Sequence, residues 1–390
     1  MAIVSFEQRG KVIQVTWENG RCESFHYIWL RDNAPIADNL DPNTEERLVD
    51  FHTFPLVPRP STISLDNSGN LVVAWRDLKG EVVYPANWLL THAYSEEARA
   101  DRASAIPSAE PWRFETKSEA PIFDHDTVIN SGQTELSFLR AFRTFGLAFL
   151  EGAPTETGVV ERLTRRLGYT REVAFGYIRD VRSEPTYDNV AFTSHRVPPH
   201  IDAVNYIWPY DVQFLHCIVN AAQGGDSWVV DGHAVAGRLK QDDPEAFDLL
   251  SRVKVDYKIG ARSFDVRHAG PVLELDRNGI LRIVRFSNQQ RRILSVPHEH
   301  VEPFYRAYRI FSAMVNDPVN HLTFRFNPGD VMMFNNHRVM HARGAFDPQS
   351  GPRHLQLGTT DMDMVDSRIR ILATDLQTDP QAVRPSAAAQ

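Results

Sequence analysis

The chain has 390 residues, of which 42% are hydrophobic and 24% are charged, and its formal net charge is −8. This composition is ordinary for a globular protein of two or three domains with a large core. The acidic balance argues against a nucleic-acid partner, and no apolar run approaches the ~20 residues that span a bilayer. Two cysteines, Cys22 and Cys217, and the absence of an apolar leader predict a cytoplasmic protein without a disulfide framework.

The first hundred residues read as short strands separated by turns. Asn19-Gly20 lies between two strand-like runs, which is typical of a β-hairpin, and the turn residues 67–70 precede a second run. A helix-like stretch over 88–102 follows. We therefore expect a small β domain over residues 1–102, and then a linker over 103–121, which is rich in Ala, Ser, Pro and charge.

Residues 122–375 read as one larger domain. Helices are expected at 134–147 and 157–167, and a third begins where Asp243 caps Pro244. Apolar strand candidates follow at 212–219, 227–230, 271–275, 281–286, 330–334 and 354–360. Many short strands with few helices predict a mainly β fold with flanking helices, a double-sheet architecture such as a jelly roll. We expect the tail, 376–390, to be flexible.

A candidate metal site begins with His200 and Asp202. In an extended segment, residues i and i+2 point to the same side, so this pair offers a nitrogen and a carboxylate to one ion. His341, after the strand candidate at 330–334, is the expected third ligand. Two His and one carboxylate form the open face used by non-haem Fe(II) oxygenases. The spacing alone is weak, because about two His-x-Asp/Glu pairs are expected by chance in such a chain.

Specificity comes from what surrounds the three residues. The turn Asn327-Pro328-Gly329-Asp330 leads into the strand before His341. Arg353 follows twelve residues later on another strand candidate, where a guanidinium can bind a carboxylate through two hydrogen bonds. Upstream, the turn Gly224-Gly225-Asp226-Ser227 supplies a hydroxyl. We interpret His216 and His354 as structural histidines.

With these motifs in place, the chain resembles the γ-butyrobetaine hydroxylase and trimethyllysine hydroxylase family of the taurine-dioxygenase-like oxygenases. The segments that carry the resemblance span nearly the whole chain: WLRDN, HID, VQFLHC, GGDS, VDG, NPGDV, HRVMHAR, RHLQ and SRIRIL. The resemblance implies a jelly-roll catalytic core in which His200, Asp202 and His341 bind Fe(II). It also implies that Arg353 holds the distal carboxylate of 2-oxoglutarate, with Ser227 beside it, that O2 is consumed, and that ascorbate can assist.

The chain departs from the family in its N-terminal domain. Relatives often hold a structural zinc there through three cysteines after WLRDN and a later histidine. Here those positions read Ala34, Ile36 and Asn39, and residues 79–81 contain no histidine. Alanine and isoleucine cannot bind zinc, so we expect no zinc and a domain held by its apolar core.

A second departure concerns the substrate pocket. The family grips a trimethylammonium group with aromatic rings, a cation–π device. The corresponding positions here are Phe175, Arg179, Phe192 and Thr359, so one ring is replaced by a cation. We expect these residues to bind the substrate: Phe175, Tyr177, Arg179, Asn189, Phe192, Tyr206 and Asn288.

Arg179 beside a fixed cation would be repulsive. Either Arg179 turns out to pair with Asp180, or the substrate presents an anion to it. Tyr177, Tyr206 and Trp208 could instead rebuild a cage, and Arg285, Arg291 and Arg292 could favour an anion or lie on a solvated face. On this reading γ-butyrobetaine itself is turned over poorly.

The sequence thus predicts an Fe(II)- and 2-oxoglutarate-dependent dioxygenase that hydroxylates an unactivated C–H of a small polar metabolite, most like a γ-butyrobetaine-type betaine. The alternatives are the same chemistry on a trimethylammonio-alkylphosphonate or on an amino-acid or natural-product substrate. A non-catalytic cupin-like metal-binding or sensor protein is the alternative of another class. A small molecule is the expected partner, without nucleic acid or membrane, and a homodimer is suggested by analogy.

Overall fold

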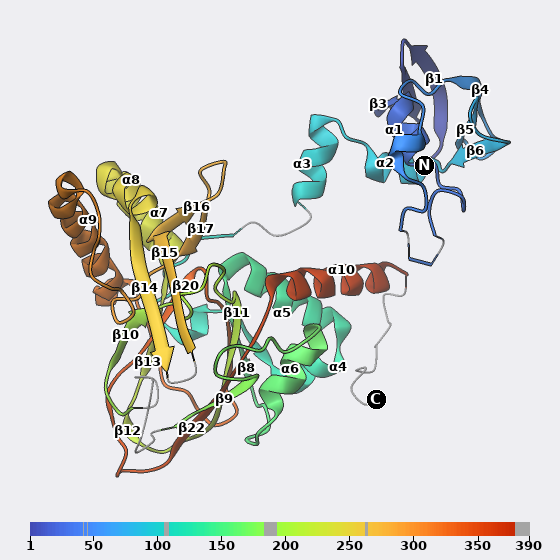
Figure 1. The fold of residues 1–390 in the computed structure, drawn as a ribbon. Helices are drawn as coiled ribbons and strands as arrows, with labels where there is room; N and C mark the ends of the chain where they lie inside the picture. The colour runs from blue at the N-terminus through green and yellow to red at the C-terminus, as the bar shows by residue number, and fades with distance from the viewer. Residues whose placement is uncertain (42, 45, 105–108, 183–192, 262–263, 379–390) are drawn as a thin grey trace. The chain divides into compact units, whose positions relative to one another are not determined.

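The computed structural model describes residues 1–390 except 42, 45, 105–108, 183–192, 262–263 and 379–390. The chain divides into two compact units, Met1–Ile106 and Pro107–Gln390, each with its own hydrophobic core. The fold is mostly β-structure with some helices (Figure 1). Within the described residues, none of the helices combines the length and the apolarity that crossing a membrane requires.

The N-terminal unit contains two three-stranded antiparallel sheets and three helices, built around one core that includes Trp17, Phe25 and Trp75. Gly20 turns the predicted hairpin with φ +84°, which glycine adopts without strain. The helix-like stretch at 88–102 forms two helices, because the first helix ends at His92 and the second begins at Glu96. The elements are β1 (Ile3–Arg9), β2 (Val12–Trp17), β3 (Cys22–His26), α1 (Tyr27–Asp32), β4 (Pro60–Leu65), β5 (Leu71–Trp75), β6 (Glu81–Tyr84), α2 (Ala86–His92) and α3 (Glu96–Ser104).

The larger unit contains a six-stranded sheet in the order β7-β8-β19-β11-β22-β9. Four helices cover one of its faces, with a core drawn from both (Figure 1). The strands are β7 (Ile122–Asp124), β8 (Leu147–Glu151), β9 (Ile178–Val181), β11 (Val212–Asn220), β19 (Val331–Asn335) and β22 (Arg353–Thr360), and the helices are α4 (His125–Asn130), α5 (Gly132–Phe145), α6 (Val159–Leu167) and α10 (Met362–Thr378).

A second sheet faces the first across another core. Its order is β10-β20-β13-β18, and its strands are β10 (Val197–His200), β20 (Val339–Arg343), β13 (Ser227–Asp231) and β18 (Leu322–Phe324). The first sheet contributes to both cores because neighbouring residues of a strand point to opposite faces. Val331 and Met333 of β19 pack under the helices, whereas Met332 and Phe334 face the second sheet. The residues that face inward from both sheets therefore surround one interior.

Three further helices pack on one another and on short strands at another part of this unit (Figure 1). Asp243 caps α8 by accepting from the Ala246 N–H, with Pro244 in the first turn, as predicted. The elements are α7 (Gly232–Asp242), α8 (Pro244–Arg252), α9 (His298–Asn316), β14 (Lys254–Ala261), β15 (Phe264–Pro271), β16 (Leu273–Leu275) and β17 (Leu281–Val284). Elsewhere in the unit, β12 (Gln223–Gly224) and β21 (Phe346–Asp347) form a separate two-stranded sheet.

The other predicted elements lie close to observed ones, with three differences in their bounds. The helix expected at 134–147 ends at Phe145, because Gly146 adopts a left-handed conformation before β8. The expected linker, 103–121, is too long in its second half: Trp112 is buried, and its backbone N–H donates to Asp231. The composition of this segment did not predict its packing, because Trp112 packs against a part of the chain that is distant in sequence. Helix α10 extends to Thr378, and residues 379–390 of the expected tail lie outside the described residues.

Candidate metal centre and cavity

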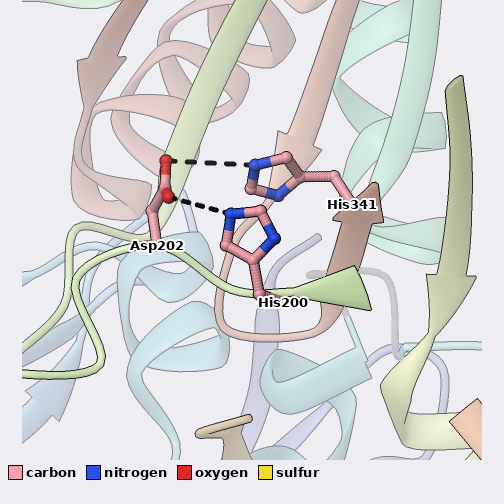
Figure 2. Close-up of side chains that lie close together, drawn as sticks. All are labelled: His200, Asp202 and His341. Atoms are coloured by element: carbon pink, nitrogen blue, oxygen red, sulfur yellow. Dashed lines mark ion pairs between the residues drawn. The ribbon is translucent and has the colours of Figure 1, made fainter. Parts of the chain in front are cut away.

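Three side chains that could hold a metal ion converge inside the larger unit. The Nε2 atom of His200 lies 3.4 Å from Oδ1 of Asp202, and Nε2 of His341 lies 4.0 Å from Oδ2 (Figure 2). One ligand atom from each residue falls within 4.8 Å of the others. Two atoms that each lie ~2.1 Å from one ion are at most ~4.2 Å apart, so both spacings suit a shared ion.

Strand pairing brings the two histidines together. In the antiparallel pairing of β10 with β20, His200 lies directly opposite His341. The next strand, β13, places Val229 opposite His341 and Ser227 opposite Arg343. Asp202 follows β10 by two residues, in the turn after the strand. The predicted triad is therefore assembled by register between segments more than 130 residues apart in the chain.

Hydrogen bonding orients His200 for metal binding. Its Nδ1 lies 2.9 Å from the carbonyl oxygen of Pro198, which can only accept, so Nδ1 carries the proton and Nε2 presents a lone pair toward Asp202. Burial, followed by the neighbouring His200, lowers the pKa of His341 to about 3, so this ring is neutral. Burial alone would raise the pKa of Asp202. The proximity of His200, and then of His341 and Arg179, outweighs burial and lowers that pKa well below its usual range.

A buried amide fixes the backbone of Asp202. The side chain of Asn336 accepts from the Asp202 N–H at 2.8 Å and donates to the carbonyls of Asp202 at 3.0 Å and Tyr210 at 2.9 Å. Asn336 is fully buried in the turn between β19 and β20. The turn that precedes His341 thereby also positions Asp202.

A second clamp holds the loop that follows. Arg285 is fully buried and donates to the carbonyls of Val204 and Tyr206 at 2.9 and 2.8 Å, while Glu274 accepts at 2.8 Å. The two sequence interpretations of Arg285, anion binding and a solvated face, are both wrong, because its donors serve backbone carbonyls and an acidic partner. Arg291 instead stacks on Tyr308, 4.8 Å from the ring centroid.

The triad opens onto a cavity of about 310 Å³. This volume is at the lower end of the ~300–1,000 Å³ that is usual for small-molecule sites. Arg353 lines it, is only 9% exposed, and makes no hydrogen bond or ion pair with the part of the chain that the structure describes. Burial lowers the pKa of Arg353 to about 10, which leaves it charged at neutral pH. Ser227 and Phe175 also line this cavity.

Arg179 lines the cavity because it points inward from β9. It pairs with Leu357 of β22, which pairs in turn with Leu215 of β11, and both leucines line the cavity. Neighbouring residues of a strand point to opposite faces, so Asp180 points away. Asp180 lies 2.6 Å from Nε2 of His354 and 3.0 Å from Nε2 of Gln356. The expected alternative in which Arg179 turns out to pair with Asp180 is therefore wrong in this structure.

Other predicted pocket residues are not brought to the cavity. Tyr177 is 55% exposed, Asn288 is exposed, and neither they nor Tyr206 are among the described residues that line the cavity. Trp208 packs edge-on against His337 and is not among them either. Asn189 and Phe192 lie outside the described residues. Their assignment to the substrate stays a prediction.

Sequence reasoning missed several residues of the site. Arg343 lines the cavity, and its position two residues after His341 on one strand was a usable signal. Tyr210, whose hydroxyl accepts a 3.3 Å hydrogen bond from Arg179, and Asn336 gave no such signal. Lys258, Gln289 and Gln290 reach the cavity from β14 and the segment after β17, far from the triad in sequence.

Comparisons with known proteins assign the chain to a family. Residues 108–359 match the taurine catabolism dioxygenase TauD, TfdA family, and residues 4–90 match the gamma-butyrobetaine hydroxylase-like N-terminal family. The gamma-butyrobetaine dioxygenase of Pseudomonas sp. (strain AK-1) is 37% identical over 92% of this chain and 93% of that protein. The human gamma-butyrobetaine dioxygenase is 31% identical over 93% of this chain and 94% of its own length.

More distant similarities were also found. The mitochondrial trimethyllysine dioxygenase of Bos taurus is 29% identical over 83% of this chain and 77% of that protein. Among solved structures, an asparagine oxygenase matches with a TM-score of 0.47 and 18% identity, over 58% of this chain and 79% of that chain, and the assignment does not rest on it. The chain belongs to the taurine catabolism dioxygenase TauD, TfdA family, and it is an Fe(II)- and 2-oxoglutarate-dependent dioxygenase.

Proposed function

We propose that the enzyme hydroxylates a small betaine, with Fe(II) held by His200, Asp202 and His341 and 2-oxoglutarate held by Arg353 and Ser227. One observation carries this proposal. A two-histidine, one-carboxylate group with matched spacings lines the same cavity as a buried arginine that has no hydrogen-bond partner among the described residues. That donor set is the one used by non-haem Fe(II) oxygenases.

Arg353 is suited to the distal carboxylate of 2-oxoglutarate. It lies on the inward face of β22 with Leu355 and Leu357, and its guanidinium is 5.3 Å from the centroid of the Phe346 ring, which restrains its plane. A planar guanidinium binds a carboxylate through two parallel hydrogen bonds. The Ser227 hydroxyl, 7% exposed on the facing sheet, is a further donor.

When bound, iron supplies O2 activation: one oxygen atom enters the substrate C–H bond, and the other enters succinate as 2-oxoglutarate loses CO2. The protein positions the metal ligands and excludes water from the site. The clamp of Asn336 fixes Asp202, and the hydrogen bond from His200 to Pro198 fixes that ring. Apolar walls, which include Val229, Met332 and Leu355, keep water from the reacting centre.

The substrate class follows from the relatives and from the size of the cavity. The most similar proteins described above are named for γ-butyrobetaine, a zwitterion of a quaternary ammonium and a carboxylate. A cavity of about 310 Å³ suits a small molecule. We therefore assign a betaine of this size as the substrate.

The same proposal covers the finer architecture. The two facing sheets and their shared inward core support a double-stranded β-helix, or jelly roll, as the catalytic core within residues 122–375. The separate core of the N-terminal unit supports a small β domain over residues 1–102.

The test is succinate release from 2-oxoglutarate in the presence of Fe(II), O2 and betaines. Arg353→Gln should raise the KM for 2-oxoglutarate by roughly 10- to 150-fold, because it removes charged hydrogen bonds. Arg238→Gln, on the exposed face of α7, is the matched control and should behave as wild type. Release of succinate that needs no iron, or an unchanged KM in Arg353→Gln, would overturn the proposal.

A further inference from the structure

The charges that line the cavity are unbalanced. Among the described residues that line it, the one carboxylate is Asp202. Five cationic side chains line it as well: Arg179, Lys258, Arg292, Arg343 and Arg353. Bound Fe(II) and bound 2-oxoglutarate carry opposite charges of two, so together they leave this excess in place. A substrate that enters the cavity therefore meets a positive potential.

Three of these cations either have partners within the protein or are exposed to solvent. Lys258 pairs with Asp265 at 2.9 Å. Arg343 donates to the carbonyls of Thr193 and His195 at 2.7 and 2.8 Å. Arg292 is exposed to solvent, which screens its charge. Arg353 is assigned to 2-oxoglutarate above, so Arg179 is the cation whose role is unexplained.

Arg179 has aromatic and hydroxyl neighbours but no carboxylate within ion-pair distance among the described residues. Its guanidinium lies 5.8 Å from the centroid of Phe175 and 5.7 Å from that of Tyr210, whose hydroxyl accepts its hydrogen bond. None of the carboxylates in the described part of the chain pairs with it within 4.0 Å. Asp202 influences Arg179 from further away, and its own oxygens face the two histidines.

A half-buried cation without a close anionic partner carries a desolvation cost that a bound anion would relieve. Tyr210 occupies one side of the guanidinium through its hydroxyl, and the aromatic faces restrict its motion. The remaining N–H donors are the ones free to meet a ligand in the cavity. Because Arg179 and the triad line the same small cavity, that ligand would also be within reach of the iron.

We propose that Arg179 binds the anionic group of the substrate and makes a carboxylate, or an oxyanion of similar shape, a requirement for binding. This inference rests on the proposed function, since it assigns an orientation to a betaine in that site. The carboxylate meets Arg179, and the quaternary ammonium lies at the end of the molecule away from it. The repulsion expected from the sequence applies only to the opposite orientation, with the ammonium against Arg179.

The experiment compares three ligands of one shape. γ-Butyrobetaine carries both charges, 5,5-dimethylhexanoate replaces the ammonium nitrogen by carbon, and butyltrimethylammonium replaces the carboxylate by a methyl group. Each is tested for stimulation of succinate release and for competition with γ-butyrobetaine in the iron-loaded enzyme. In the wild type, the dimethylhexanoate should compete and butyltrimethylammonium should not.

Variants then assign the effect to Arg179. Arg179→Gln should raise the KM for γ-butyrobetaine by roughly 10- to 150-fold and leave the KM for 2-oxoglutarate within about twofold. Arg179→Lys should fall between, because it keeps the charge and loses the planar fork. Arg182→Gln is the matched control, since Arg182 is 53% exposed and does not line the cavity.

The outcomes separate the inference from the function on which it rests. If γ-butyrobetaine is hydroxylated but Arg179→Gln leaves its KM unchanged, or if butyltrimethylammonium competes as well as the anion, the anion subsite is wrong and the proposed function stands. An increased KM for 2-oxoglutarate instead would assign Arg179 to the co-substrate and also overturn the inference. If no betaine stimulates iron-dependent succinate release, the proposed substrate class itself fails.

Discussion

Each unit of the chain contains a buried arginine, and only one of the two has a hydrogen-bond partner among the described residues. This difference separates a structural arginine from one that is available to a ligand. In the N-terminal unit, Arg31 is 6% exposed; its Nε donates to Asp77 at 2.7 Å, and its guanidinium lies 4.4 Å from the centroid of the Phe54 ring. In the larger unit, Arg353 is 9% exposed and has no hydrogen-bond partner among the described residues. A buried charge that the protein itself neutralises is structural, whereas one left open marks the place of a ligand.

The comparison extends to the rest of each region. Around Arg31, the buried amide of Asn39 donates to the carbonyls of Arg31 and Ala34 at 3.4 and 3.3 Å. This closed cluster lies where relatives are expected to use zinc. In the cavity, the ligand atoms of the triad face one another, and Nε2 of His341 lies 4.0 Å from Oδ2 of Asp202.

The largest effect is expected when the metal site loses its carboxylate. Asp202→Ala should reduce iron-dependent succinate release to background, because the ion loses its anionic ligand. The melting temperature should stay close to that of the wild type. Asp242→Ala, an exposed residue of α7, is the control and should retain full turnover. Iron-dependent turnover in Asp202→Ala would contradict the site.

A smaller loss is expected when the ligand remains but its support is removed. Asn336→Ala deletes the three hydrogen bonds that the Asn336 side chain makes to the backbone of Asp202 and Tyr210. We expect Fe(II) affinity to fall by roughly 10- to 100-fold, as measured by anaerobic titration. Asn316→Ala, whose amide bonds a carbonyl on the exposed part of α9, should bind iron normally. Unchanged affinity in Asn336→Ala would show that Asp202 is positioned without this clamp.

In the N-terminal unit, the corresponding change should affect stability and not catalysis. Arg31→Met removes the partner of Asp77 and should lower the free energy of unfolding of this unit by about 1–3 kcal/mol. Arg47→Met breaks an exposed pair with Asp32 and should cost about 0–1 kcal/mol. Denaturant titration compares the two, and kinetic assays should give an unchanged KM for 2-oxoglutarate. A raised KM in Arg31→Met would break the distinction between the two regions.

These regions also differ in how far the sequence could predict them. The triad and Arg353 could be anticipated because they lie in motifs that resemble those of the family, whereas the i, i+2 spacing of His200 and Asp202 was a weak signal by itself. The burial of Arg285 could not, because it depends on the carbonyls of Val204 and Tyr206, which come from a distant loop. Likewise, Tyr177 and Arg179 share a strand parity, yet Tyr177 precedes β9 and is exposed, so only the position of the strand end separates them.

The smallest expected effect is that removal of zinc changes nothing. Ala34 and Ile36 cannot bind zinc, and they pack with the apolar core of the N-terminal unit. Treatment with a zinc chelator should therefore leave the melting of this unit unchanged, and elemental analysis of purified protein stripped of iron should find no zinc. Stoichiometric zinc would show that other residues of the chain provide a site.

The cavity leaves charges open at the positions where we propose that the metal and 2-oxoglutarate bind. The most direct measurement is a crystal structure of the enzyme with 2-oxoglutarate and Mn(II), a redox-inert substitute for Fe(II), grown without O2. We predict one ion within ~2.0–2.3 Å of His200, Asp202 and His341, with the distal carboxylate of 2-oxoglutarate hydrogen-bonded to Arg353. An ion held by other residues, or an Arg353 that remains unpartnered beside bound 2-oxoglutarate, would contradict the account.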